Sequence, residues 1–221
     1  MAETTAQPPA AMSPDEEEAV FYHESALNSS WTGVRLALGG LSFLFGSFVF
    51  AFFYLKSINS HHLWYTATSH PQSWVGVVVM ALVVVSAAVQ TLALQRIKAG
   101  TKAPWLAGAT LALVLGLVAI SIQLWQLAAL PFWPGSSGFA SVFVGFQPVF
   151  VAVALCMLVW LEILIMRCRA IPEISFVEQP PTYAEAFAVQ RFQASLSAFT
   201  LAWNYLAVVA FIAWVLFYLV H

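Results

Sequence analysis

Charged side chains are scarce in this sequence, and their scarcity excludes most soluble folds. Asp, Glu, Lys and Arg make up 8% of the 221 residues, whereas 61% are hydrophobic and the mean hydropathy is +0.83. Soluble domains carry about 25% charged residues, because a water-facing surface needs them. A chain with so few charges is predicted to expose most of its surface to lipid.

A basic surface, paired cysteines and catalytic motifs are missing as well. The net charge of -2 and the pI near 6.2 exclude the basic surface that binds nucleic acid. The two cysteines, Cys156 and Cys168, have neither a disulfide framework nor the spacing of metal ligands. The sequence contains no phosphate-binding glycine loop and no nucleophile elbow. We therefore expect no catalytic residues in this chain, and no metal or cofactor of its own.

Long apolar runs dominate what is present. Five of them come close to the roughly 20 residues that cross a hydrocarbon core about 30 Å thick. Lipid offers no partner for exposed backbone groups, so each run is predicted to be a helix. The predicted fold class is an all-α, polytopic transmembrane bundle of five helices over residues 31–221. The spans cover approximately 31–55, 74–94, 105–127, 139–166 and 196–220.

Small residues recur in the first three spans. In membrane helices such residues allow the backbones of two helices to approach closely. They therefore predict a compact bundle. The residues are Gly39, Gly40, Gly46, Ser47, Ser86, Ala87, Ala88, Gly108, Gly116 and Ala119.

The residues before the first span are of another kind. Residues 1–30 contain an acidic run at 15–18 and almost nothing apolar to bury. That composition cannot offset the entropy of ordering the chain, so it predicts a disordered acidic tail. The tail also lacks the basic start and short apolar core of a signal peptide, so we expect the first span to be retained.

The basic residues predict a direction across the membrane. Most lie in the loops between spans two and three and between spans four and five, and the loop between spans three and four has none. The positive-inside rule then places the N-terminus in the cytoplasm and the C-terminus outside. In the longer of these basic loops, residues 182–193 are rich in alanine and form either a short interfacial helix or a plain connector.

Two ionisable residues lie within spans, each near one end. Arg35 can extend its side chain to the lipid headgroups. Glu162 is read either as a snorkelling or locally paired carboxylate, or as part of a proton relay. Arg35, Arg96 and Lys98 are candidate contacts for headgroup phosphates.

The remaining polar residues in the spans are amides, and the histidines lie outside the spans. Amides in hydrocarbon usually point into the bundle and bond across helices, so we read them as packing or interface residues. No histidine lies within a span, as a haem or copper ligand in a bundle would have to. His61 and His62 belong either to an interfacial loop or to an external metal site. The amides are Gln90, Gln123, Gln126, Gln147 and Asn204.

Several segments match the motifs of one membrane-protein family. The first span ends in Ala51-Phe52-Phe53-Tyr54-Leu55-Lys56, and the third contains Leu115-Gly116-Leu117 and then Gln123-Leu124-Trp125-Gln126. The fourth begins with Gly138-Phe139-Ala140-Ser141-Val142-Phe143-Val144-Gly145-Phe146-Gln147, like a Y-G-S-x-F-F-x-x-T-G-F-H motif. The fifth contains Trp203-Asn204-Tyr205-Leu206-Ala207-Val208-Val209, like W-H-F-V-D-V-V. Over residues 31–221 the chain resembles subunit III of the haem–copper oxidases, in the five-helix form of many bacterial terminal oxidases.

The ionisable positions of that family are substituted here. The family's buried Glu corresponds to Leu41, and the Glu that follows the glutamine motif corresponds to Gln126. The family's two His in the fourth helix correspond to Gln147 and Phe150. Its His and Asp in the last helix correspond to Asn204 and Ala207.

The resemblance implies a non-catalytic subunit in the plasma (inner) membrane of a bacterium. Such a subunit serves aerobic electron transport by packing against and stabilising the catalytic subunit I, which holds haem and copper, beside other oxidase subunits. It also implies phospholipid in a cleft whose first wall is the first span, with Gly46 and Ser47 permitting close approach. Two alternatives remain open: an accessory subunit of a nitric oxide reductase, and an unrelated small membrane transporter or scaffold. Pro148 offers the break that a transporter helix would need.

Overall fold

Helices account for the regular structure of the described residues, which are 14–59, 64, 71–172, 176 and 183–220 in this computed structural model. They are α1 (Pro14–Ser57), α2 (Ser73–Lys98), α3 (Lys102–Ala128), α4 (Gly138–Ala170), α5 (Tyr183–Trp214) and a π-helical turn, η2 (Val215–Leu219). Five segments are long and apolar enough to cross a membrane. The predicted all-helical bundle with five spans is therefore confirmed over these residues. The five segments are Phe21–Ser57, Ser73–Lys98, Lys102–Ala128, Gly138–Ala170 and Phe187–Leu219.

The helices extend beyond the apolar runs of the sequence. α2 continues to Lys98 and α4 to Ala170, so both include basic residues in their last turn. Positive charge is favourable there, because the carbonyl end of a helix carries partial negative charge. The alanine-rich segment is helical from Tyr183 onward, so it is not a plain connector, and it leads into the fifth span as part of the continuous helix α5 (Tyr183–Trp214).

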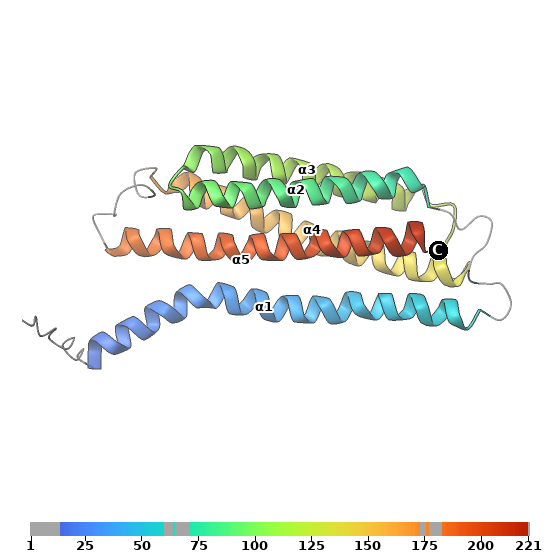
Figure 1. Ribbon diagram of the computed structural model, residues 1–221, viewed down its shortest axis with the longest axis horizontal. Coiled ribbons are helices and arrows are strands. Elements are labelled where there is room, and N and C mark those ends of the chain that lie inside the picture. The colour runs from blue at the N-terminus through green and yellow to red at the C-terminus, as the bar shows by residue number, and fades with distance from the viewer. Residues whose placement is uncertain (1–13, 60–63, 65–70, 173–175, 177–182, 221) are drawn as a thin grey trace, which may run out of the picture.

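The expected disordered tail is only partly compatible with the structure. Residues 1–13 lie outside the described residues, but α1 begins at Pro14, so residues 14–30 are helical. Proline suits the first turn of a helix because its fixed φ is already helical and its missing N–H needs no partner. The first turns of α1 lean away from the other helices (Figure 1).

Successive helices run in opposite directions, which gives the bundle two chemically different ends (Figure 1). We call the end formed by the C-termini of α2 and α4 and the N-termini of α3 and α5 the basic end. We call the opposite end, which carries Lys56 and Gln72, the far end. Six of the eight Lys and Arg residues lie at or close to the basic end: Arg96, Lys98, Lys102, Arg167, Arg169 and Arg191.

α1 is the outlying helix of the bundle. α2 and α3 pack together as a hairpin, α5 packs beneath them, and α1 packs mainly on α4 and α5 (Figure 1). Only 11% of the most apolar window of α1 is buried, against 33–56% for the other four spans. Most of the surface of α1 is therefore open to lipid or to another protein.

Aromatic rings join α1 to the bundle at the far end. Phe52 is fully buried and contacts the rings of Trp64 and Phe217 edge to face, at centroid distances of 4.9 and 5.8 Å. Phe217 also contacts Phe143 of α4 at 5.2 Å. Edge-to-face pairs of this kind add to the stabilisation that comes from burying the rings. The cluster holds α1, α4 and η2 together.

The small residues divide into two groups that the sequence does not distinguish. A Cβ on Gly108 would lie 2.8 Å from Cβ of Ala93, and one on Gly116 would lie 2.6 Å from Leu158, so both glycines permit close contacts. By contrast, a Cβ on Gly39, Gly40 or Gly46 would meet no atom within 4 Å. Ser47 is exposed as well. The expectation that these residues of α1 bring helices of this chain together is wrong.

Candidate functional site

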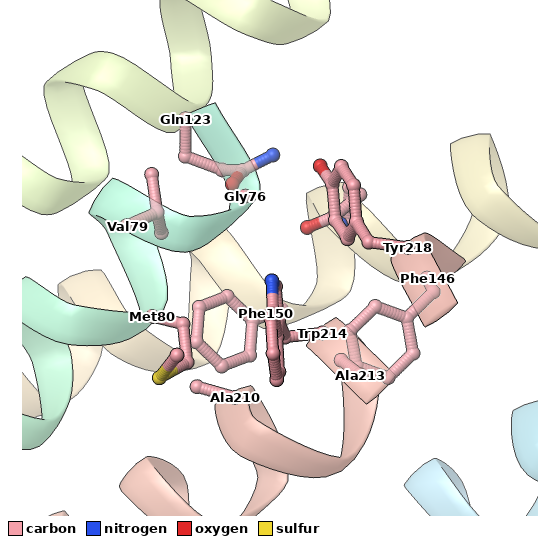
Figure 2. A pocket seen from close by; sticks show the side chains of 11 residues that line it. Gly76, Val79, Met80, Gln123, Phe146, Phe150, Ala210, Ala213, Trp214 and Tyr218 are labelled. Atoms are coloured by element: carbon pink, nitrogen blue, oxygen red, sulfur yellow. The ribbon is translucent and has the colours of Figure 1, made fainter. Parts of the chain in front are cut away.

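A small polar cavity lies near the far end, between α2, α3, α4 and the α5–η2 junction (Figure 2). It has about 30 Å³ of room for the centres of water molecules. Its polar wall consists of Gln123, Gln147, Trp214 and Tyr218. The rest of its lining is apolar: Gly76, Val79, Met80, Phe146, Phe150, Ala210 and Ala213.

A chain of hydrogen bonds connects this wall to the far end of the bundle. Nε2 of Gln126 donates to the backbone oxygen of Gln72 at 3.3 Å and to the hydroxyl of Tyr218 at 3.1 Å. One turn deeper in α3, Nε2 of Gln123 donates to Oε1 of Gln126 at 3.1 Å. Gln123 and Gln126 are each 2% exposed. The chain therefore carries polar groups from the surface into the apolar interior.

Two polar groups in the cavity wall lack partners. Gln147 is 5% exposed and its amide makes no hydrogen bond to any described residue. The indole Nε1 of Trp214 is buried and likewise unpartnered among the described residues. In Figure 2 this nitrogen points toward the space between Gln123 and Tyr218. Buried groups of this kind are rare, and one that lines a cavity can bind a water molecule there.

Local sequence explains how the wall is assembled. Gly76 lets the ring of Tyr218 approach α2, because a Cβ there would lie 2.4 Å from ring atoms. Tyr218 lies in η2, and π-turns are rare and frequently occur at functional sites. Pro148, in the first half of α4, is exposed within a continuous helix, so α4 is not broken as a transporter helix would be.

Three residues of two helices, Gln126 of α3 and Gln147 and Phe150 of α4, meet around this cavity. Gln147 and Phe150 line it, and Gln126 bonds to Tyr218 and Gln123 in its wall. Amides donate and accept hydrogen bonds and an indole N–H donates one, in both cases without a proton that ionises near neutral pH. The cluster is therefore suited to binding water and to fixing helices.

A second set of polar contacts joins α2 to α5 nearer the middle of the bundle. The indole Nε1 of Trp203 donates to Oγ of Ser86 at 3.1 Å, and Ser86 donates to the backbone oxygen of Ala112 at 2.7 Å. Nδ2 of Asn204 donates to Oγ1 of Thr91 at 3.0 Å. Asn204 thus bonds across helices, as amides in membranes usually do.

Two apolar clefts flank α1. One, of about 250 Å³, lies against α4 and α5 and contains a single polar contact, between Oγ of Ser42 and the hydroxyl of Tyr205 at 3.1 Å. The other, of about 570 Å³, lies against α4 and is lined by Leu41 among other residues. Both are wide enough for hydrocarbon chains and almost entirely apolar.

The predicted lipid contacts are spread over the surface and do not form one site. Arg35 is exposed on α1 and lies 5.1 Å from the ring of Trp31. Arg96 and Lys98 are exposed at the end of α2. A groove of about 390 Å³ at the basic end instead lies between Arg167 and Arg191. Sequence reasoning did not single out this groove, because its two arginines belong to different helices.

The other ionisable candidates are also scattered. Glu162 is exposed on α4 and forms no ion pair with another described residue. His61 and His62 lie outside the described residues. Among the residues that are described, no three His, Cys, Asp or Glu side chains lie close enough together to hold a metal ion.

Sequence reasoning missed the aromatic partners of the amides. Tyr218 and Trp214 lie near the end of the last span, where such residues are normally read as interfacial anchors. Their spacing of four residues, which puts them on one helix face, was the available signal.

No family model matches this chain, and no curated protein matches it significantly.

Proposed function

We propose that this chain is a non-catalytic membrane subunit of the haem–copper oxidase subunit III type, which packs against a catalytic subunit and stabilises it. The observation that carries the proposal is a set of open glycines on two sides of α1. Gly33, Gly39, Gly40 and Gly46 each have room for a Cβ without contact to this chain. Glycine weakens a helix by about 1 kcal/mol relative to alanine, so four such residues are unfavourable unless another helix uses them.

The buried polar residues support a packing role. Those of the described core are Ser86, Gln90, Gln123, Gln126, Ser137, Gln147 and Thr200, which are amides and hydroxyls without an ionisable side chain. A proton-coupled transporter would need ionisable groups at such depth. The resemblance of the helix motifs to subunit III adds the identity of the partner, a subunit that holds haem and copper. On this proposal, electron transport takes place in the partner.

The proposal includes lipid and a direction across the membrane. The two clefts beside α1 would take acyl chains, and Arg35, Arg96 and Lys98 would meet headgroup phosphates. The concentration of basic residues at one end favours a cytoplasmic N-terminus and an outside C-terminus in a bacterial inner membrane. A C-terminal alkaline phosphatase fusion is then expected to be active and a C-terminal green fluorescent protein fusion dark. The reverse pattern would contradict this direction.

Purification from native membranes tests the proposed partner. The tagged full chain is expected to co-purify with a multi-helix subunit that contains haem and copper and reduces O2. Gly39→Leu, at an open glycine of α1 that lines neither of the two clefts, is expected to lower the haem recovered at least tenfold. Ala88→Leu, at an exposed position of α2, is the matched control and should leave it unchanged. A haem-free preparation that transports a solute would sink the proposal, and a complex that reduces nitric oxide instead of O2 would identify the other class of partner.

A further inference from the structure

The amide of Gln147 is the strongest unexplained feature of the interior. It is 5% exposed and lines the cavity, and no hydrogen bond joins its amide to a described residue. The amide is not among the fully buried groups without a partner, so the cavity reaches it. A primary amide offers two donor hydrogens and an acceptor oxygen. An amide that faces a cavity can bind a molecule there, and the buried, unpartnered Nε1 of Trp214 in the same wall makes such a molecule favourable.

Complementary groups face the same cavity. The Nε1 donor of Trp214 has no partner among the described residues. Gln123 uses Nε2 to bond Gln126, while its Oε1 accepts no hydrogen bond from a described residue. The cavity wall therefore offers at least one free donor and one free acceptor in addition to the Gln147 amide (Figure 2).

The size of the cavity limits its occupant. A single water molecule needs about 10–15 Å³ of space for its centre, together with two to four polar partners. The cavity offers about 30 Å³ and three under-bonded side chains.

We propose that this cavity is a binding site for about two ordered water molecules, which bridge Gln147 to Gln123 and Trp214. The waters continue the polar chain that begins at the backbone of Gln72 and passes through Gln126 and Gln123. They join α3 and α4 to the α5–η2 junction. Trp214 directly precedes the π-turn and Tyr218 lies within it, so the bridged network holds η2 in its register against α2.

Water-to-protein magnetisation transfer tests this site directly. The full chain, with its nine tryptophans labelled with ¹⁵N, is reconstituted in lipid nanodiscs. The indole signal of Trp214, assigned with Trp214→Phe, is expected to receive magnetisation from water at short mixing times. Trp105 is the matched control, because its Nε1 is also buried and unpartnered but does not line the cavity. If the Trp214 signal builds up no faster than that of Trp105, the site is not hydrated and the proposal fails.

A variant and a second measurement extend the test. Gln147→Met keeps the length of the side chain without its amide, and is expected to reduce the transfer to Trp214 at least twofold. An unchanged transfer would exclude Gln147 as a water ligand. The second measurement is a density map of the wild-type chain at a resolution that shows ordered water. The map should show water within hydrogen-bonding distance of the Gln147 amide. A direct bond between Gln147 and Trp214, without water between them, would overturn the proposal.

Discussion

The ring of Tyr218 packs directly on the backbone of Gly76 at the far end of the bundle. A Cβ on Gly76 would lie 2.4 Å from the Cε2 and Cζ atoms of that ring. Tyr218 cannot easily move away, because its hydroxyl bonds to Gln126 at 3.1 Å. The absence of a side chain at Gly76 is thus what allows η2 to reach α3 past α2.

Gly76→Ala is therefore expected to destabilise the chain. Overpacking against a ring that is held in place costs about 1–3 kcal/mol, which exceeds the gain of up to about 1 kcal/mol in helix propensity. Thermal unfolding in detergent, followed by circular dichroism, measures the change. Gly40→Ala is the control, since a Cβ there meets nothing within 4 Å and only the propensity gain remains. Equal stability of the two variants would show that the Tyr218 contact is not tight.

Ser86→Ala is expected to cost about 1–2 kcal/mol, because it leaves the buried indole N–H of Trp203 without its acceptor. Trp203 is fully buried, so water cannot replace the lost bond. A double-mutant cycle with Trp203→Phe separates the bond from the packing, and Ser86→Ala should cost clearly less in that background. Ser121→Ala is the control, because this exposed hydroxyl bonds only to its own helix. Additive costs in the cycle would contradict the bond.

The sequence predicted the number and approximate position of the spans because a transmembrane helix needs a long apolar run. The helix ends were less predictable. A helix can extend beyond the apolar run that crosses the lipid. α2 therefore reaches Lys98, and α5 begins at Tyr183. The disordered tail was predicted from its composition, but composition did not reveal that residues 14–30 form the first turns of α1.

Which face of each helix points inward could not be predicted. In a soluble helix an apolar stripe marks the buried face, whereas a helix that is apolar all round carries no such mark. Gly46 and Gly116 look alike in sequence, yet a Cβ on Gly116 would meet Leu158 and Trp203 whereas one on Gly46 would meet no atom within 4 Å. The amides were predictable as polar groups in hydrocarbon, but their convergence on Tyr218 depends on the register of η2.

Thr91→Val is expected to destabilise the bundle by about 0.6 kcal/mol, with an upper limit of about 2 kcal/mol. This is the usual range for a hydrogen bond between membrane helices. The substitution keeps the shape of the side chain but removes the hydroxyl that accepts from Asn204 at 3.0 Å. Thr110→Val is the matched control, because the hydroxyl of Thr110 is exposed and bonds only within its own helix. Denaturant unfolding of the two variants in mixed micelles measures the difference, and a Thr91 variant as stable as the Thr110 variant would refute it.

Lys102→Met is expected to loosen the C-terminal end of α4 without disturbing the rest of the bundle. The ammonium group of Lys102 donates to the backbone oxygens of Arg169 and Ile171, two of the carbonyls that a helix end leaves unpaired. A cation at this position stabilises the helix end by about 0.3–1 kcal/mol, and methionine keeps the apolar stem while removing the charge.

The measurement for Lys102→Met is hydrogen exchange of the backbone amides in the last turn of α4. Exchange there should become about two- to fivefold faster, because about 0.3–1 kcal/mol of local stability corresponds to that factor. Lys98→Met is the control, since Lys98 is exposed and bonds to no described residue of α4. Faster exchange over the whole chain would indicate a global loss of stability. Unchanged exchange at the α4 end would show that Lys102 does not cap this helix.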